Sequence, residues 1–479
     1  MIKLNNVRNK LAALIPNNEF VKKASILVGG TAGAQLLMVL ASPLLTRLYS
    51  PEQFGMLAVF LSILGIFTVI VSFRYELAIP LPENKIEAAS LVILCLGLVV
   101  GVTLFSSLAV YLFGQSFSNY FRVPELNNYI WLLPLAILLV GIYQIFNYWS
   151  IRNNQYSIIA TTRIKQSIAS LLIQILGSKY GSGFLLGGAV GSQCVGSFTL
   201  ARHAFKDPVF RDVNIGNVRN AIYRYRRFPL FSTWSGFFNT GGQQLPPLMF
   251  AAYFGATAAG LYVLANRVLI MPMSVIGGAI SNVFLSDAAR TYEQGKLPSL
   301  VNSVTSKLIQ IAMPPAILLI FVAPQLFSAV FGDKWELAGV FAQWMAPWLY
   351  FVFVASPLSM LTAVLEKQQQ GLIFNGVLLF VRVLAIIIGA WYGELILAVI
   401  LFSLGSAVCW CVFSFWLTHV AGGDIGKLLM NSFKAFAISI LLMTPVALTN
   451  LISIDWWLGL CISSIALCCY YFSLFRKAY

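Results

Sequence analysis

Hydrophobic residues in this chain fall into long runs that short polar segments separate. Fourteen of these runs approach the length of about 20 residues that a helix needs to cross the hydrocarbon core of a bilayer. They lack the ten-residue polar and apolar alternation of a transmembrane β-barrel. The pattern therefore predicts an all-α membrane protein with about fourteen transmembrane helices. The predicted spans are 25–45, 55–73, 88–113, 129–149, 164–178, 183–202, 230–252, 256–286, 303–325, 338–364, 371–391, 394–417, 434–451 and 454–475.

Composition and charge support this prediction and add an orientation. The 479 residues are 59% hydrophobic and 10% charged, whereas soluble domains carry about 25% charged residues. If the N-terminus is cytoplasmic, 25 of the 31 Lys and Arg residues lie on the inner side and four on the outer side. This asymmetry follows the positive-inside rule and predicts that both termini are cytoplasmic. It also explains the net charge of +15 without a nucleic-acid partner.

A weak internal repeat predicts how the spans are grouped. With an offset of 205 residues, LYSPEQFGMLAVF from Leu48 aligns with YFGATAAGLYVLA from Tyr253. Both halves begin on the inner side, as parallel repeats about the membrane normal do, and such lobes enclose a central cavity. The predicted domains are an interfacial segment at 1–24, an N-lobe of six helices at 25–202, a basic cytoplasmic linker at 203–229, a C-lobe of six helices at 230–417, and two C-terminal helices with the tail at 418–479.

Two arginines, Arg267 and Arg382, fall inside predicted spans. An arginine at the centre of a spanning helix costs roughly 2.5 to 3.5 kcal/mol on insertion scales, so such residues usually face a protein interior or a wet cavity. The guanidinium group offers a forked set of donors that suits phosphate and carboxylate oxygens. We therefore predict that the central cavity binds an anionic substrate. The alternative is a structural role, in which the arginines bond to backbone carbonyl groups.

Neutral polar residues form stripes on several predicted spans. They either line the cavity or form hydrogen bonds between packed helices. In the linker, Arg224, Arg226 and Arg227 either attract anionic lipid headgroups and fix the topology, or recruit the substrate to the cytoplasmic mouth. The candidate substrate-binding residues are Arg267, Arg382, Gln35, Asn239, Gln243, Gln244, Asn375 and Ser274.

The acidic residues lie at the ends of predicted spans or in loops, and Glu76 is expected to form a structural pair with Arg74 or to have a functional role. An exporter of cationic drugs ordinarily needs a buried carboxylate, which disfavours that alternative. The two histidines have neither metal-ligand spacing nor a nucleophile nearby, and the chain has no P-loop pattern. We therefore predict neither an enzyme, nor a metal site, nor a cofactor, and coupling to a proton or sodium gradient stays open.

The run TRLYSPEQFGMLAVFLSILGIFTVIVSFRYELAIPLPENKIEA, residues 46–88, resembles the N-terminal region of bacterial polysaccharide flippases. These belong to the multidrug, oligosaccharidyl-lipid and polysaccharide exporter superfamily. The pattern R-L-Y-S-P-E-x-F-G followed by R-Y-E-L-A-I is typical of its O-antigen and repeat-unit translocases. NYWSIRNNQYSIIATTRIKQ looks like the loop that follows span four in the family. The fourteen spans and their layout agree with the superfamily over essentially the whole chain.

The resemblance implies two helical bundles around a V-shaped lumen in the bacterial inner membrane. It implies a flippase that moves undecaprenyl-diphosphate-linked oligosaccharide to the periplasmic leaflet by alternating access, for O-antigen, capsule or exopolysaccharide synthesis. In the related lipid II flippase the cavity arginines include one on span eight, where Arg267 falls. A monomer is expected, with lipids, a polysaccharide polymerase and a chain-length regulator as candidate partners. The alternatives are a multidrug or lipid II-like exporter on the same scaffold and, less favoured, a membrane polysaccharide polymerase or ligase.

Overall fold

Helices account for the regular structure of the described part of the chain, which in this computed structural model comprises residues 19–451 and 456–476. No strand occurs in these residues. Eleven of their helices are long and apolar enough to cross a membrane, judged by length and composition. The prediction of an all-α, multi-pass membrane protein is confirmed. Most of the predicted interfacial segment 1–24 lies outside the described residues.

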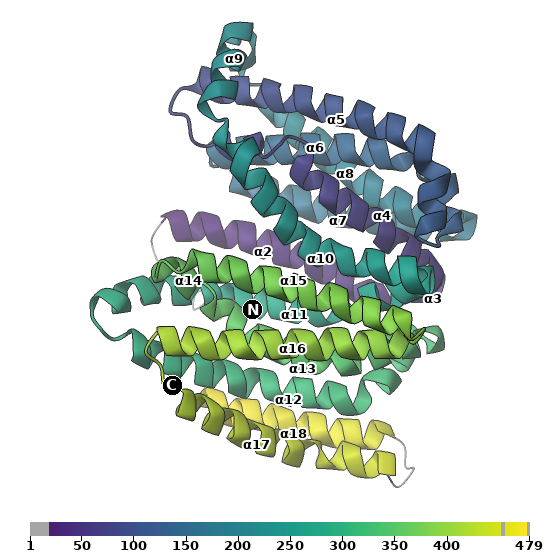
Figure 1. Ribbon diagram of the computed structural model, residues 1–479, viewed down its shortest axis with the longest axis vertical. Helices are drawn as coiled ribbons and strands as arrows, with labels where there is room; N and C mark the ends of the chain where they lie inside the picture. Colours follow the sequence, from purple (N-terminus) through teal and green to yellow (C-terminus); the bar gives the residue numbers. More distant parts are fainter. Residues whose placement is uncertain (1–18, 452–455, 477–479) are drawn as a thin grey trace, which may run out of the picture. The chain divides into compact units, whose positions relative to one another are not determined.

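The chain divides into two compact units, residues 1–244 and 245–479. In the first unit, the helices in chain order are α2 (Glu19–Leu40), α3 (Ser42–Leu48), α4 (Pro51–Ile70), η1 (Tyr75–Ala78), α5 (Lys85–Tyr120), η2 (Pro124–Asn128), α6 (Leu132–Arg152), α7 (Tyr156–Gly177), η3 (Ser178–Tyr180), α8 (Gly183–Ala204), η4 (Pro208–Asp212), α9 (Ile215–Arg224) and the π-helical turn η5 (Phe228–Ser232). α10 (Thr233–Phe254) continues across the boundary between the units. Within the first unit α7 packs against α2 and α8, and α6 packs against α5 and α8 (Figure 1).

The second unit is built from longer helices. They are α11 (Ala256–Glu293), α12 (Leu297–Phe331), η6 (Asp333–Trp335), α13 (Glu336–Leu358), α14 (Leu361–Val364), α15 (Gln368–Trp391), α16 (Leu395–Val420), α17 (Ile425–Leu451) and α18 (Trp456–Arg476). α13 packs against α11, α12 and α16, and α15 packs against α16. The last two helices, α17 and α18, pack against each other, and α17 also packs against α12 of the same unit (Figure 1).

Helices occupy the positions of all fourteen predicted spans in the described residues. Several helices extend beyond the predicted spans, by up to nine residues at α17, which begins at Ile425 instead of 434. α5 continues to Tyr120, beyond the predicted end at 113, and α7 begins at Tyr156, eight residues before the predicted start at 164. The earlier start of α7 matters for the site, because it brings a further arginine into a helix.

Residues 50–53, which belong to the family-like motif, form the N-terminal cap of α4. Ser50 caps α4: its hydroxyl accepts a hydrogen bond from the Gln53 backbone N–H at 3.4 Å, and Gln53 Oε1 accepts one from the Ser50 N–H at 2.9 Å. Pro51 follows at the first helical position, where its missing N–H costs no hydrogen bond. The sequence S-P-E-Q is therefore a helix start signal that fixes where α4 begins.

Candidate functional site

Arg267 lies on α11, eleven residues after the helix begins at Ala256, which places it about 16 Å along the helix axis. Its side chain is half-buried, and its neighbours Leu264 and Ala265 are fully buried. α11 packs against α13 of the same unit. A permanent cation therefore lies well inside a long helix that is mainly apolar. Its contact with a substrate stays a prediction.

Arg382 on α15 is held by side chains from two neighbouring helices. Its Nε donates a hydrogen bond to the hydroxyl of Ser406 on α16 at 3.1 Å. The guanidinium carbon lies 4.9 Å from the ring centroid of Trp348 on α13 and 5.3 Å from that of Phe402 on α16. These aromatic faces attract the cation electrostatically, by about 0.5 to 2 kcal/mol per ring. The charge of Arg382 thus has a fixed position in the second unit.

The other candidate substrate-binding residues are distributed over both units. The side chain of Gln244 is half-buried and packs on α4, because a Cβ atom at Gly65 would come within 2.9 Å of Gln244 Cδ. The side chain of Ser274 lies outside the described residues. The side chains of Gln35, Asn239, Gln243 and Asn375 are exposed. Their role in substrate binding stays a prediction.

Sequence reasoning missed Arg163 as an intrahelical cation, since it assigned this residue to an inner loop. The structure places Arg163 two turns inside α7. Its Nη1 donates a hydrogen bond to Thr31 Oγ1 on α2 at 2.8 Å. Its Nε is buried and has no hydrogen-bond partner among the described residues. The apolar pair Ile158 and Ile159 upstream of it was the available signal that the helix begins earlier.

A second polar side chain of α7, one turn after Arg163, contacts a different helix. One turn further on, Gln166 Nε2 lies 3.5 Å from Gln193 Oε1 on α8. This approach requires the glycine at 196, because a Cβ atom there would lie 2.1 Å from Gln166 Nε2. The first unit therefore contains a polar contact between α7 and α8, one turn from the cation that α7 directs at α2.

Glu76 is fully buried in η1, between α4 and α5. The chain reaches this position through two left-handed residues, Phe73 with a φ of 49° and Arg74 with a φ of 63°, a conformation that is uncommon for bulky residues. The Ser72 hydroxyl donates to Glu76 Oε2 at 2.5 Å, and Arg74 Nη1 lies 3.7 Å from Glu76 Oε1. Burial raises the pKa of Glu76, while the Ser72 hydrogen bond and the Arg74 charge oppose this effect.

A pH dependence of stability follows from the buried carboxyl group. Because the pKa of Glu76 is raised above 4.5 in the folded protein, its favourable contribution is fully present below the unfolded pKa and is lost as the pH rises through the folded pKa. In detergent, the Tm of wild type relative to that of Glu76→Gln should therefore decrease as the pH rises from 4.5. Glu83→Gln, at an exposed position five residues after η1, should keep the wild-type profile. Parallel profiles for wild type and Glu76→Gln would contradict the prediction.

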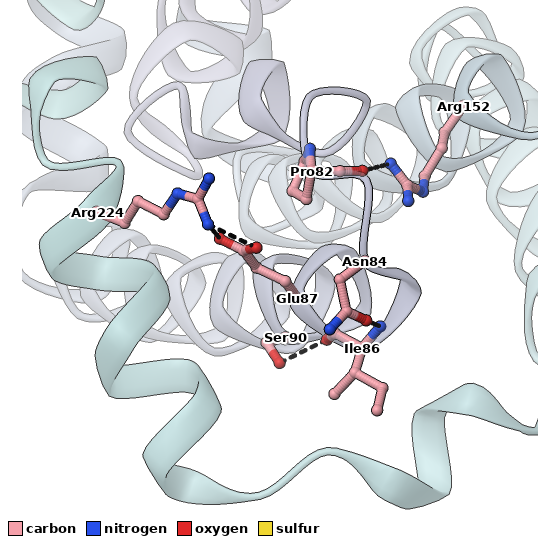
Figure 2. Close-up of polar contacts among 7 residues, drawn as sticks. All are labelled: Pro82, Asn84, Ile86, Glu87, Ser90, Arg152 and Arg224. Atoms are coloured by element: carbon pink, nitrogen blue, oxygen red, sulfur yellow. Dashed lines mark hydrogen bonds and ion pairs between the residues drawn. The ribbon is translucent and has the colours of Figure 1, made fainter.

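Two arginines contact the segment 82–87, which follows η1. This end of the first unit is predicted to face the cytoplasm. Arg152, at the end of α6, donates hydrogen bonds to the Pro82 carbonyl and, at 3.1 Å, to the Glu83 carbonyl. Arg224, at the end of α9, forms an ion pair of 2.8 Å with Glu87 on α5. Figure 2 shows both arginines reaching this segment from different helices. Of the three predicted mouth residues, Arg224 is thus paired; the side chains of Arg226 and Arg227 are exposed.

Tyr225 directly follows the last residue of α9. Tyr225 is buried, and burial raises its pKa, with a smaller contribution from the negative charge of Glu87. The phenol therefore stays protonated and remains a donor at neutral pH. The Tyr75 hydroxyl on η1 donates a hydrogen bond of 3.3 Å to the Ile222 carbonyl on α9. Together with the Arg224–Glu87 ion pair, it fixes α9 against η1 and the start of α5.

Comparison with solved structures defines the class of protein. The chain is similar to the lipid II flippase MurJ in its inward closed conformation, with a TM-score of 0.74 and 15% identity over 94% of this chain and 99% of that one. It is also similar to an inward-facing multidrug resistance transporter of the MOP superfamily, with a TM-score of 0.63 and 14% identity over 83% of this chain and 98% of that one. At these identities the likeness concerns the fold. The chain is a multi-pass membrane protein with the fold of the MOP exporters.

The sequence comparisons then give the family. The model of the polysaccharide biosynthesis protein family matches residues 44–339, which is more than half of the chain, and the chain belongs to this family. The teichuronic acid biosynthesis protein TuaB of Bacillus subtilis (strain 168) is 29% identical over 112 residues. This segment covers 23% of the present chain and 23% of the length of TuaB. The predicted resemblance to the exporter superfamily is confirmed.

Proposed function

We propose that the protein is a flippase for undecaprenyl-diphosphate-linked oligosaccharide repeat units. It moves them from the cytoplasmic to the periplasmic leaflet of the bacterial inner membrane by alternating access, and they then serve O-antigen, capsule or exopolysaccharide synthesis. Two findings support this class of cargo: the chain belongs to a polysaccharide biosynthesis family, and its fold is that of a flippase for lipid II.

The observation that carries the proposal is the pair of arginines within the helices of the second unit. A lipid diphosphate must leave water when it enters a protein in the bilayer, and fixed cations offset part of that cost. Arg382 is positioned by Trp348, Phe402 and Ser406, and Arg267 lies inside α11. We assign both to the anionic part of the cargo.

The remaining candidate residues have supporting roles in this proposal. The candidate amide side chains contact sugars, and Arg226 and Arg227 attract the lipid diphosphate to the cytoplasmic mouth by long-range electrostatics. A polymerase and a chain-length regulator are the proposed protein partners of a monomeric flippase. The amide side chains assigned to the sugars are Gln35, Asn239, Gln243, Gln244 and Asn375.

A multidrug exporter is the second candidate, because the fold of such a transporter matches most of this chain. A cationic drug would need an accessible carboxylate. The buried carboxylate of Glu76 lies 3.7 Å from Arg74 and outside the long helices. The cations within α11 and α15 would repel a cationic drug. These contacts favour an anionic cargo over a cationic one.

Deletion of the gene in its own host tests the function directly. We expect an undecaprenyl-linked oligosaccharide to accumulate and the surface polymer to disappear, because units that are not flipped stay on the inner leaflet. The measurement is mass spectrometry of extracted lipid-linked sugars, with the wild-type gene returned on a plasmid as the control. Normal surface polymer and no accumulated lipid-linked unit in the deletion strain would overturn the proposal.

A further inference from the structure

A polar pocket lies between the start of α5 and α9, within the first unit and outside the helices that carry the two arginines. Its volume is about 590 Å³, which falls in the range of roughly 300 to 1,000 Å³ that small-molecule sites occupy. The side chain of Tyr223 at this pocket is 61% exposed, so the pocket is accessible. Its polar lining consists of Asn84, Glu87, Asn217, Asn220, Tyr223 and Arg224.

The amides in this lining are available to a ligand. Asn84 caps α5 through its Oδ1, which accepts from the Ile86 N–H at 2.9 Å (Figure 2), so its NH₂ group keeps two donors. For the side chains of Asn217 and Asn220, no hydrogen bond is found within the described part of the chain. Each amide therefore offers both a donor and an acceptor, which is the combination that a hydroxyl group requires.

The charges in the lining cancel. Arg224 and Glu87 are the two charged residues of the pocket, and their side chains form an ion pair at 2.8 Å. A phosphate in this pocket would meet a carboxylate and a guanidinium group that is already paired. An organic cation would meet a carboxylate that is neutralised.

An exposed aromatic ring completes the site. The guanidinium group of Arg219 lies 6.0 Å from the Tyr223 ring centroid, and contacts of this kind favour a defined orientation of the ring. The ring offers an apolar face and a polar hydroxyl. The C–H face of a sugar ring packs on such a surface, while the sugar hydroxyls bond to amides. Apolar contact is extended by Ile86 at the same pocket.

We propose that this pocket is a carbohydrate-binding site, in which Asn217 and Asn220 bond to sugar hydroxyls, Tyr223 stacks on the sugar ring and the Arg224–Glu87 pair fixes the shape of the site. The identity of the sugar as part of the cargo rests on the proposed function. In that function, the pocket lies at the predicted cytoplasmic end and binds sugar residues of the oligosaccharide. Its diphosphate reaches Arg267 and Arg382 afterwards. Sugar binding itself can be tested without lipid-linked cargo and without transport.

The experiment is saturation-transfer difference NMR on the purified full-length protein. The protein is held in phosphatidylcholine nanodiscs, because maltoside detergents would themselves supply sugar. The probes are free galactose, N-acetylglucosamine, cellobiose and maltotriose. Wild type is compared with the double variant Asn217→Ala/Asn220→Ala. The matched control is Asn127→Ala/Asn128→Ala, which removes two exposed amides in η2, beyond the opposite end of α5.

We expect at least one probe to receive saturation from wild type and from the control variant. The pocket variant should bind it about tenfold more weakly, which corresponds to the loss of one or two hydrogen bonds. Equal transfer to wild type and the pocket variant, transfer to none of the four sugars, or displacement of the sugar by inorganic phosphate would each overturn the carbohydrate assignment. The flippase proposal fails separately, if the deletion strain accumulates no lipid-linked unit.

Discussion

Arg267→Ala is expected to abolish export while the protein remains folded and inserted. In our proposal this cation on α11 neutralises the diphosphate or an acidic sugar, and alanine offers nothing in its place. Insertion should not suffer, because a charge at the centre of a spanning helix opposes insertion by roughly 2.5 to 3.5 kcal/mol. The measurement is polymer at the cell surface divided by the amount of inserted protein, in a deletion strain that carries each variant.

Two further variants make this result interpretable. Arg267→Lys keeps the charge and loses the forked donor geometry, so partial export is expected. Arg211→Ala removes an exposed arginine from η4, and this variant should export normally. Full export by Arg267→Ala at a normal protein level would rule out the contact with the cargo. A loss of inserted protein in Arg267→Ala would instead assign the arginine a structural role.

Arg382→Ala is expected to lower the thermal stability and the export together. The change removes the hydrogen bond to Ser406 and the contacts with Trp348 and Phe402. The Ser406 hydroxyl, which is fully buried, would lose the guanidinium group as a donor. A charge-assisted hydrogen bond contributes about 1.5 to 3 kcal/mol and each ring contact about 0.5 to 2 kcal/mol. The expected loss is therefore on the order of 3 kcal/mol.

This loss is measured as a decrease in Tm of the purified variant, alongside export per inserted protein. Arg382→Lys should retain part of the ring contact, because an ammonium group also binds to aromatic faces, and its Tm should fall less. Ser406→Ala isolates the hydrogen bond and should cost less than Arg382→Ala. An Arg382→Ala protein with the wild-type Tm and no export would show that the residue acts on the cargo without supporting the fold.

The ion pair of Arg224, at the end of α9, could not be predicted from the sequence pattern. Sequence alone placed Arg224, Arg226 and Arg227 together as one basic cluster. The structure separates them, because Arg224 pairs with Glu87, a residue 137 positions away in the chain. Charge counting detects the basic segment, but it does not show which charges are neutralised. Only the approach of α9 to α5 reveals that.

The burial of Glu76 could not be predicted from the sequence pattern either. The sequence places it at the end of an apolar run, where solvent exposure is the ordinary expectation for an acid. Its complete burial depends on the left-handed turn at Phe73 and Arg74 and on the hydroxyl of Ser72. No local pattern of apolar residues predicts such a turn, since its conformation is stabilised by contacts with other helices: a Cβ atom at Gly236 on α10 would lie 2.5 Å from Arg74 Nη2.

The sequence by itself determined the membrane class, the positions of the fourteen helices and the resemblance to the exporter superfamily. These features are local, because a span depends on about 20 consecutive apolar residues and a helix start on a capping sequence such as S-P-E-Q. Only the tertiary structure decided the partners of the polar side chains. Arg163 meets Thr31, Arg382 meets Trp348 and Ser406, and Arg224 meets Glu87. Each of these contacts joins different helices, so it arises from packing, which the periodicity of a single segment does not encode.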